Sequence, residues 1–329
     1  MFVEAIDRIL RDRCTPEVVR AIESGSSPRG LWDDLTGGGF LELLAPAEQD
    51  GAGLELADAY RIFALFGRYA IPVPAAQSIA ARAMVAAGVR LPDGLLTLAP
   101  ALHRNADGSL SCPLVPFGSI AEHVLAVGPE GLMLLSCERA ERTPTGVFGS
   151  LTASLEWSQE DCARRVAGDP GALRSFGAAI HAAMLAGAMD RVFEMSLQFC
   201  NDRIQFGKPL GKFQAIQHQL SVMAEQVAAC GIAAESAFQS KGRSPHPLAA
   251  AIAKARCSEA AAFVANVGHA LHGAIGVTAE YDLQLLTRRL HEWRVAHGSE
   301  THWHAYIGAQ VLASGGSMSD FVREVWEQP

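Results

Sequence analysis

The stretch CNDRIQFGKPLGKFQAIQHQL, residues 200–220, decides how the chain is organised. Apolar residues recur every three or four positions before it, from Met184 to Phe199, and after it, from Ile216 to Cys230. This spacing predicts an amphipathic helix on each side. Glycines and a proline between the two patterns would interrupt a helix. The stretch is therefore predicted to be a loop that joins two long helices.

The composition of this loop indicates which ligand it would bind. Its helix-breaking, charged and aromatic residues are Gly207, Pro209, Gly211, Arg203, Lys208, Phe206 and Phe213. The planar guanidinium of an arginine can make two charge-assisted hydrogen bonds to phosphate oxygens at once. Aromatic rings add flat apolar surface. Such a loop suits an anionic, planar ligand, although an exposed basic turn between helices would use similar residues.

The same loop resembles a known motif. The spacing of Arg203, Phe206, Gly207, Pro209, Leu210 and Gln214 resembles the flavin-contacting loop of acyl-CoA dehydrogenases. The resemblance implies that Arg203 meets the pyrophosphate of FAD and that Phe206, Gly207 and Gln214 lie against the cofactor. In that family the loop usually reaches the cofactor from the subunit opposite the one that holds the flavin ring. FAD is thus the expected cofactor.

Composition excludes several other classes of protein. The chain has 329 residues, 49% of them hydrophobic and 19% charged, which is enough to bury large cores. A net charge of −8 argues against a surface for nucleic acid or an anionic membrane. The seven cysteines are scattered without a C-x-x-C pair, so no disulfide framework or zinc site is expected. Because neither a secretion signal nor a charge-free membrane span is recognised, we expect a cytoplasmic protein.

Residues 1–90 are predicted to form an N-terminal helical domain. Helical patterns are recognised near Ile6–Leu10, Val18–Ile22, Leu31–Leu35, Asp58–Tyr69 and Ala75–Gly88. The segment from Phe40 to Gly53 resembles the passage in acyl-CoA dehydrogenases that turns through glycines beside the substrate channel. Glycine and proline punctuation explains the same segment without any function.

Residues 91–167 are predicted to form a small β-domain, because the apolar pattern becomes short and alternating. Strand-like runs are found at residues 95–98, 109–115, 123–127, 131–136 and 154–157. The corresponding domain of the family grips the flavin ring with a loop rich in serine or threonine. No such loop is recognised here, and residues 91–161 are fewer than in the family's usual middle domain. We therefore do not expect this subunit to hold a flavin ring by itself.

Residues 168–329 return to long helices, predicted at about 174–203, 211–240, 246–273 and 282–314, which would pack as a four-helix bundle. The expected fold class is therefore mainly α with a small β-domain, as in acyl-CoA dehydrogenases. The turn after residue 270 resembles the family's glycine-rich turn beside the adenosine half of FAD. Gly273 and Gly276 would admit a close backbone there, whereas Ala270 and Ala274 replace a glutamine and a glycine.

The residues that follow this turn allow two interpretations. Thr278, Glu280 and Asp282 match the approach to the helix that follows the turn in the family. They would equally make a good helix start by capping and by complementing the helix dipole, without any ligand. We leave both interpretations open on the sequence.

The catalytic base is the weakest part of the resemblance. Acyl-CoA dehydrogenases use a glutamate to remove a proton from the carbon next to the thioester, and the family places it at one of two positions. Here those positions are His297 and, approximately, Gly177. His297 could act as a base, since an imidazole titrates near neutrality, and Glu300 could reach in from one turn away. A histidine in a loop before a helix is more often a surface or capping residue.

A metal site is the alternative from a different class. The candidate ligands are His297, Glu300, His302, His304, Glu280 and His291. Di-iron bundles carry a Glu-x-x-His pair on each of two helices, and the four predicted helices contain none. We therefore predict no metal.

The resemblance implies FAD-dependent α,β-dehydrogenation of an acyl-CoA thioester by one subunit of an oligomer. The alternative is a non-catalytic subunit that completes the flavin site of an unlike partner. Both a homo-oligomer and a heterotetramer are compatible with the sequence, and an electron-transfer flavoprotein is the implied electron acceptor. Short chains of this type resemble the subunits of bacterial acyl-CoA dehydrogenases that act as unlike pairs on steroid-like thioesters. Neither nucleic acid nor membrane is an expected partner.

Overall fold

The computed structural model describes residues 2–49, 51–158 and 162–327, and it begins with a group of helices. These are α1 (Phe2–Arg13), α2 (Pro16–Glu23), α3 (Arg29–Gly37), η1 (Phe40–Glu42), η2 (Ala47–Gln49), α4 (Leu56–Arg68) and α5 (Ala75–Met84). α2 begins at a proline, and its first turn is capped by the Thr15 hydroxyl, which accepts a hydrogen bond from the Val18 amide. The helical patterns predicted in this region are present.

Two four-stranded sheets follow, with strand orders β1-β4-β5-β8 and β2-β3-β7-β6. The strands are β1 (Leu96–Leu98), β2 (His103–Arg104), β3 (Leu110–Val115), β4 (His123–Gly128), β5 (Gly131–Ser136), β6 (Glu141–Pro144), β7 (Ala153–Trp157) and β8 (Ala163–Val166). All pairs are antiparallel except β1 with β4. β2, β6 and β8 were not predicted, because they are short, charged and mostly exposed.

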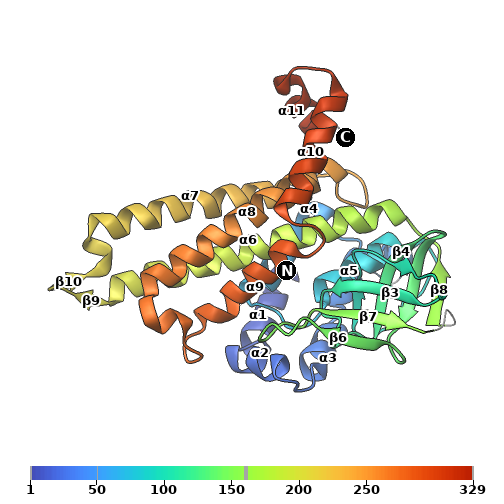
Figure 1. The fold of residues 1–329 in the computed structure, drawn as a ribbon, viewed down its shortest axis with the longest axis horizontal. Coiled ribbons are helices and arrows are strands. Elements are labelled where there is room, and N and C mark those ends of the chain that lie inside the picture. Colours follow the sequence, from blue (N-terminus) through green and yellow to red (C-terminus); the bar gives the residue numbers. More distant parts are fainter. Residues whose placement is uncertain (1, 50, 159–161, 328–329) are drawn as a thin grey trace.

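The rest of the chain forms the helical bundle and a small hairpin. Its elements are α6 (Pro170–Asp202), β9 (Ile204–Gln205), β10 (Lys208–Pro209), η4 (Leu210–Lys212), α7 (Gln214–Ser236), α8 (Pro247–His272), η5 (Gly273–Val277), α9 (Leu283–Val295), α10 (Glu300–Ser314) and α11 (Met318–Glu327). Figure 1 shows the β9–β10 hairpin at the end of the bundle that lies away from the β-strands. In the same view α10 and α11 project from the body of the molecule (Figure 1).

The single helix predicted at 282–314 is wrong, because two helices, α9 and α10, occupy this range. His297 has φ 52° and Gly298 has φ 103°, both in the left-handed region that a right-handed helix cannot use. Ser299 then caps α10, and its hydroxyl accepts a hydrogen bond from the His302 amide. The break places His297 in a short loop between two helices.

α6 is the central helix of the molecule, and it packs against α4, α5, α7, α8 and α9. Glycines allow its closest contact. A Cβ atom added to Gly187 on α6 would overlap the Ala64 carbonyl of α4, and one added to Gly67 on α4 would overlap the Met184 carbonyl of α6. The helix backbones therefore touch at this crossing.

Burial defines one large core and one smaller one. The large core includes residues of both the N-terminal helices and the bundle, whereas the β-strands enclose a core of their own around Trp157 and Leu155. The fold class of mainly α with a small β-domain is confirmed. The three domains with boundaries after residues 90 and 167 stay a prediction, since the helices on both sides of the β-strands share one core.

Among the described residues, two helical segments are long and apolar enough to cross a membrane by length and composition. They are Pro170–Asp202 and Pro247–Val277. In the most apolar window of the first, 89% of the residues are buried inside the molecule, as in the core helix of a globular protein. The corresponding share is 44% in the second, which contacts α6, α7, α9 and α10.

Candidate functional site

The predicted site residues lie at opposite ends of α6. Arg203 directly follows the last residue of this 33-residue helix, and Gly177 lies about two turns after its first residue. At about 1.5 Å per residue, the helix separates the two positions by roughly 40 Å. One chain therefore presents two distinct regions, the hairpin region around Arg203 and the His297 region around Gly177.

In the hairpin region, the tip of the β9–β10 hairpin is exposed and conformationally specific. Phe206 is 88% exposed and has φ 51°, and Gly207 follows with φ 81°. The Phe206 and Phe213 rings form a T-shaped contact with 6.2 Å between centroids, and the Lys208 ammonium lies 4.3 Å from the Phe213 centroid. A large aromatic side chain that is so exposed in a single chain is available to a ligand or a partner.

The hairpin region also offers unpaired positive charge. Arg203 is exposed, and its side chain makes no ion pair or hydrogen bond with the described residues. α7 begins beside it at Gln214, which is exposed, and the N-cap residue Phe213 provides no side-chain cap. The first amides of a helix carry partial positive charge and bind anions when they are not capped. Arg203 and the start of α7 therefore fit a diphosphate group.

The glycine turn lies at the same end of the bundle. Leu210 of η4 and Leu271 of α8 belong to one small apolar cluster, which brings the hairpin and the end of α8 together. Gly273 has φ 65°, and a Cβ atom added there would meet no atom within 4 Å, so its backbone is open to an approaching group. Gly276 is buried against His272 and Leu283, which gives this glycine a packing role.

The helix-start interpretation of the residues after this turn is only partly met. Asp282 is the N-cap of α9 but makes no capping hydrogen bond, and it accepts instead from Arg20 of α2 at 2.6 Å. The Thr278 hydroxyl donates to the Ile275 carbonyl at 2.9 Å, which closes the preceding turn. These contacts hold the turn and the start of α9 in place, and they leave the Gly273 backbone accessible.

In the His297 region, the structure brings the two predicted base positions together. A Cβ atom added to Gly177 would overlap Nδ1 of His297, so the imidazole occupies the space in front of Gly177. The His297 ring also lies against the ring of His181, with 5.0 Å between centroids. A side chain at position 177 would therefore have to displace the His297 imidazole.

Burial keeps both imidazoles neutral. Burial, together with the nearby Lys254 charge, lowers the pKa of His297 to about 4, although hydrogen bonding to the Leu98 backbone acts in the opposite direction. Burial also lowers the pKa of His181, and His297 and Lys254 add to this effect. Nε2 of each ring is buried without a hydrogen-bond partner among the described residues. A general base works best with a pKa near the operating pH, and His297 lies well below it.

Lys254 fixes the loop that carries His297. Its ammonium donates to Ser258 Oγ at 2.7 Å, to the Arg294 carbonyl at 2.8 Å and to the Gly298 carbonyl at 2.9 Å. These acceptors satisfy all three donors of the ammonium. Burial lowers the pKa of Lys254 to about 7. The buried lysine thus clamps the end of α9 to the turn before α10.

Glu300, the second candidate base, is engaged elsewhere. Arg294 donates two hydrogen bonds to its carboxylate. Hydrogen bonding to Arg294 lowers the pKa of Glu300, which is the opposite of what a base against a weak carbon acid requires. Neither candidate base therefore has the pKa that proton removal from the α-carbon calls for.

A cavity of about 520 Å³ lies between the β-strand region and the His297 loop. Its walls include Leu114, Phe148, Val295 and His297. Two hydroxyls on its β-side, Ser150 and Thr152, were not recognised from the sequence. Their positions on either side of the buried Leu151 suggest that the two hydroxyls lie on one face of the chain. Their partner Glu292, however, lies about 140 residues away along the chain, so no local pattern predicts the contact.

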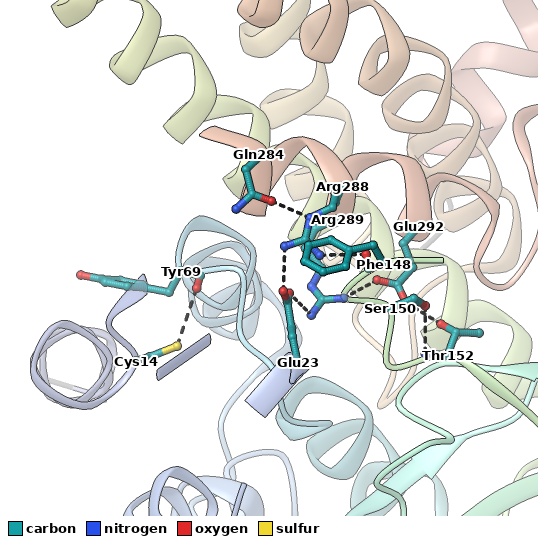
Figure 2. Close-up of polar contacts among 10 residues, drawn as sticks. All are labelled: Cys14, Glu23, Tyr69, Phe148, Ser150, Thr152, Gln284, Arg288, Arg289 and Glu292. Carbon is teal, nitrogen blue, oxygen red and sulfur yellow. Dashed lines mark hydrogen bonds and ion pairs between the residues drawn. The ribbon is translucent and has the colours of Figure 1, made fainter. Parts of the chain in front are cut away.

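A buried charge network surrounds these hydroxyls (Figure 2). Ser150 and Thr152 both donate to Oε1 of Glu292, at 2.7 and 2.6 Å. Arg289 donates to the other oxygen of Glu292 and, at 2.7 Å, to Glu23 of α2. Arg288 donates to the second oxygen of Glu23 at 2.7 Å and to the Phe148 carbonyl at 3.0 Å. The network joins α2, α9 and the loop before β7.

The metal alternative gains no support from the described residues. Among them, no group of three histidine, cysteine or acidic side chains lies close enough to hold a metal ion. His302 instead lies beside Arg174, with 3.1 Å between Nε2 and the guanidinium.

Comparison with known proteins agrees with the resemblance. Residues 175–312 match the family model of the acyl-CoA dehydrogenase C-terminal domain. Acyl-CoA dehydrogenase IpdE2 of Mycobacterium tuberculosis is 31% identical over 341 residues, which cover 100% of this chain and 98% of that protein. The ChsE4–ChsE5 complex of Mycobacterium tuberculosis contains a chain with TM-score 0.83 and 21% identity, and 96% of this chain and 97% of that one are covered. A chain of the Tcur3481–Tcur3483 steroid ACAD has TM-score 0.79 and 24% identity, covering 96% and 98%.

Proposed function

Because this chain belongs to the acyl-CoA dehydrogenase family, we propose that it serves FAD-dependent α,β-dehydrogenation of an acyl-CoA thioester as one subunit of an unlike pair. In this proposal the hairpin region binds the diphosphate and adenosine half of FAD, and the partner subunit holds the flavin ring of the same cofactor. The partner also supplies the base that removes the α-proton.

The observation that carries the proposal is the separation of the two regions. The unpaired Arg203 and the exposed Phe206 lie roughly 40 Å along α6 from Gly177 and His297, so one cofactor cannot use both regions of the same chain. A site built from the hairpin must be completed by another subunit. Arg203, Phe206, Gly207, Gln214 and the backbone at Gly273 would hold the cofactor's diphosphate and adenosine, with Gly276 shaping the turn behind Gly273.

The state of the His297 region favours an unlike partner over a second copy. A second copy would offer the same buried His297 and the same Glu300 paired to Arg294. Neither is suited to take a proton from a weak carbon acid. FAD, when bound, would accept a hydride from the β-carbon of the substrate. The role of this chain is to bind and orient the cofactor.

The finer identity of the substrate and acceptor belongs to the same proposal. The likeness to a steroid ACAD chain supports a bulky, steroid-like acyl-CoA. An electron-transfer flavoprotein is the proposed acceptor of the electrons.

The proposal is tested by changing Arg203→Ala in the co-expressed pair. Loss of charge-assisted hydrogen bonds to a diphosphate, worth about 1.5–3 kcal/mol each, should weaken FAD binding at least about tenfold. FAD retained after dialysis is measured by its absorbance near ~450 nm. The matched control is Arg243→Ala, which removes the same charge from the exposed loop between α7 and α8. Full flavin occupancy in the Arg203→Ala pair would refute the assignment.

A further inference from the structure

The polar groups of the cavity beside His297 are already paired with one another. The hydroxyls of Ser150 and Thr152 both donate to a single carboxylate oxygen of Glu292. Glu292 is only 17% exposed at its side chain, and its second oxygen accepts from Arg289. The hydroxyl donors on the β-side of the cavity are therefore not free for a ligand.

Glu292 is held in place from behind. Arg289 is 2% exposed and bridges Glu292 to Glu23, whose side chain is 4% exposed. Arg288 binds the same Glu23 and lies over the Phe148 ring, with 5.1 Å from the guanidinium carbon to the ring centroid (Figure 2). Moving Glu292 away from the hydroxyls would deprive a largely buried carboxylate of two hydrogen bonds, which is costly.

The charge of Glu292 also determines what the cavity accepts. Burial opposes its ionisation, but the Arg289 charge and the hydrogen bonds from Thr152, Ser150 and Arg289 outweigh burial and lower its pKa. An ionised carboxylate only accepts hydrogen bonds. The polar edge of a flavin ring carries two carbonyl oxygens that flank one N–H. The N–H could donate to the carboxylate, but the two carbonyl oxygens would then face a buried anion and find both hydroxyl donors occupied. The residues present therefore do not fit a flavin ring.

We infer that the cavity of this chain does not hold a flavin ring, because Glu292 takes its place as the partner of Ser150 and Thr152. Together with the proposed function, on which this step rests, the inference assigns one FAD to each unlike pair of subunits. The hairpin region of this chain completes the partner's flavin site, and the cavity of this chain stays without flavin.

The first experiment uses this chain alone and lumiflavin, which consists of the flavin ring without diphosphate and adenosine. Because lumiflavin does not need the hairpin region, the result is independent of the proposed function. Wild type should show no saturable quenching of lumiflavin fluorescence. Glu292→Ala frees both hydroxyls and leaves Arg289 paired to Glu23, so it should show saturable quenching at lumiflavin concentrations at least tenfold below the highest at which wild type shows none.

Two variants keep this test decisive. Glu292→Leu keeps much of the side-chain volume but has no atom that accepts from the hydroxyls, and it replaces Glu292→Ala if circular dichroism shows that the alanine variant is unfolded. Ser150→Ala/Thr152→Val, combined with the Glu292 change, should abolish the gained binding. Saturable lumiflavin binding by wild type, or its absence in a folded Glu292 variant, would overturn the inference.

The second experiment counts FAD in the pair formed with the unlike subunit. We expect one FAD for each pair, and none after Arg203→Ala. Two FAD molecules for each pair, of which Arg203→Ala removes one, would contradict the inference and leave the proposed function intact. One FAD that Arg203→Ala does not affect would contradict the proposed function and leave the inference intact.

Discussion

At the scale of single residues, the resemblance predicts the base near Gly177 and His297, and this region contains two buried imidazoles and a buried lysine. The His297 ring fills the space in front of Gly177, so any side chain at position 177 would overlap the ring. The His181 ring packs against His297. Lys254 fixes the loop that carries His297 by donating hydrogen bonds to the Arg294 and Gly298 carbonyls. The resemblance gave Gly177 and His297 as two alternative positions for the base, and the structure brings them together. The sequence could not show that Glu300 is paired with Arg294, because that contact depends on how the loop folds.

The buried His297 should make stability depend on pH. Between about pH 6.5 and pH 4 the unfolded chain binds a proton at this position and the folded chain does not, so the free energy of unfolding falls as pH falls. A shift of this size corresponds to at most about 3 kcal/mol. His297→Asn, which tolerates the left-handed φ, should lose less stability than wild type between pH 7.5 and pH 5 in urea titrations. Equal losses in the two proteins would contradict a neutral buried His297.

At the scale of elements, periodicity predicted the long helices and the more apolar strands, because burial of one face leaves a repeating apolar pattern. Periodicity failed to predict the features that do not depend on burying an apolar face. The exposed β6 pairs with β7 through its backbone, and the break between α9 and α10 comes from backbone conformation at His297 and Gly298. The hydrogen bonds from Ser150 and Thr152 to Glu292 join elements far apart in sequence, so no local sequence pattern predicts them.

The crossing of α4 and α6 gives a test at this scale. Gly187→Ala should destabilise the protein by about 1–3 kcal/mol or more, because the new methyl group would overlap the Ala64 backbone. The matched control is Gly308→Ala on the exposed face of α10, where a Cβ atom would meet nothing within 4 Å. That change should stabilise slightly, since alanine is the better helix former. Urea unfolding of both variants would show opposite signs, and equal effects would argue against the backbone contact.

At the scale of the whole molecule, α6 separates the two regions, and each is fitted to a different task. The hairpin region has an exposed arginine without a side-chain partner among the described residues, an exposed phenylalanine and a helix start without a side-chain cap. The His297 region has a closed network of charges and imidazoles with low pKa values. From this asymmetry between the two regions we infer a subunit that contributes to a flavin site without performing the proton transfer itself.

The most direct test is to purify this chain alone and together with the product of a neighbouring gene that encodes an unlike acyl-CoA dehydrogenase subunit. Flavin absorbance near ~450 nm, subunit stoichiometry and acyl-CoA dehydrogenation are measured on both preparations. The account predicts that the chain alone is colourless and inactive, and that the pair is yellow and active with its base on the partner. Yellow, active protein from this chain alone would contradict the account and would return His297 or Glu300 as the base.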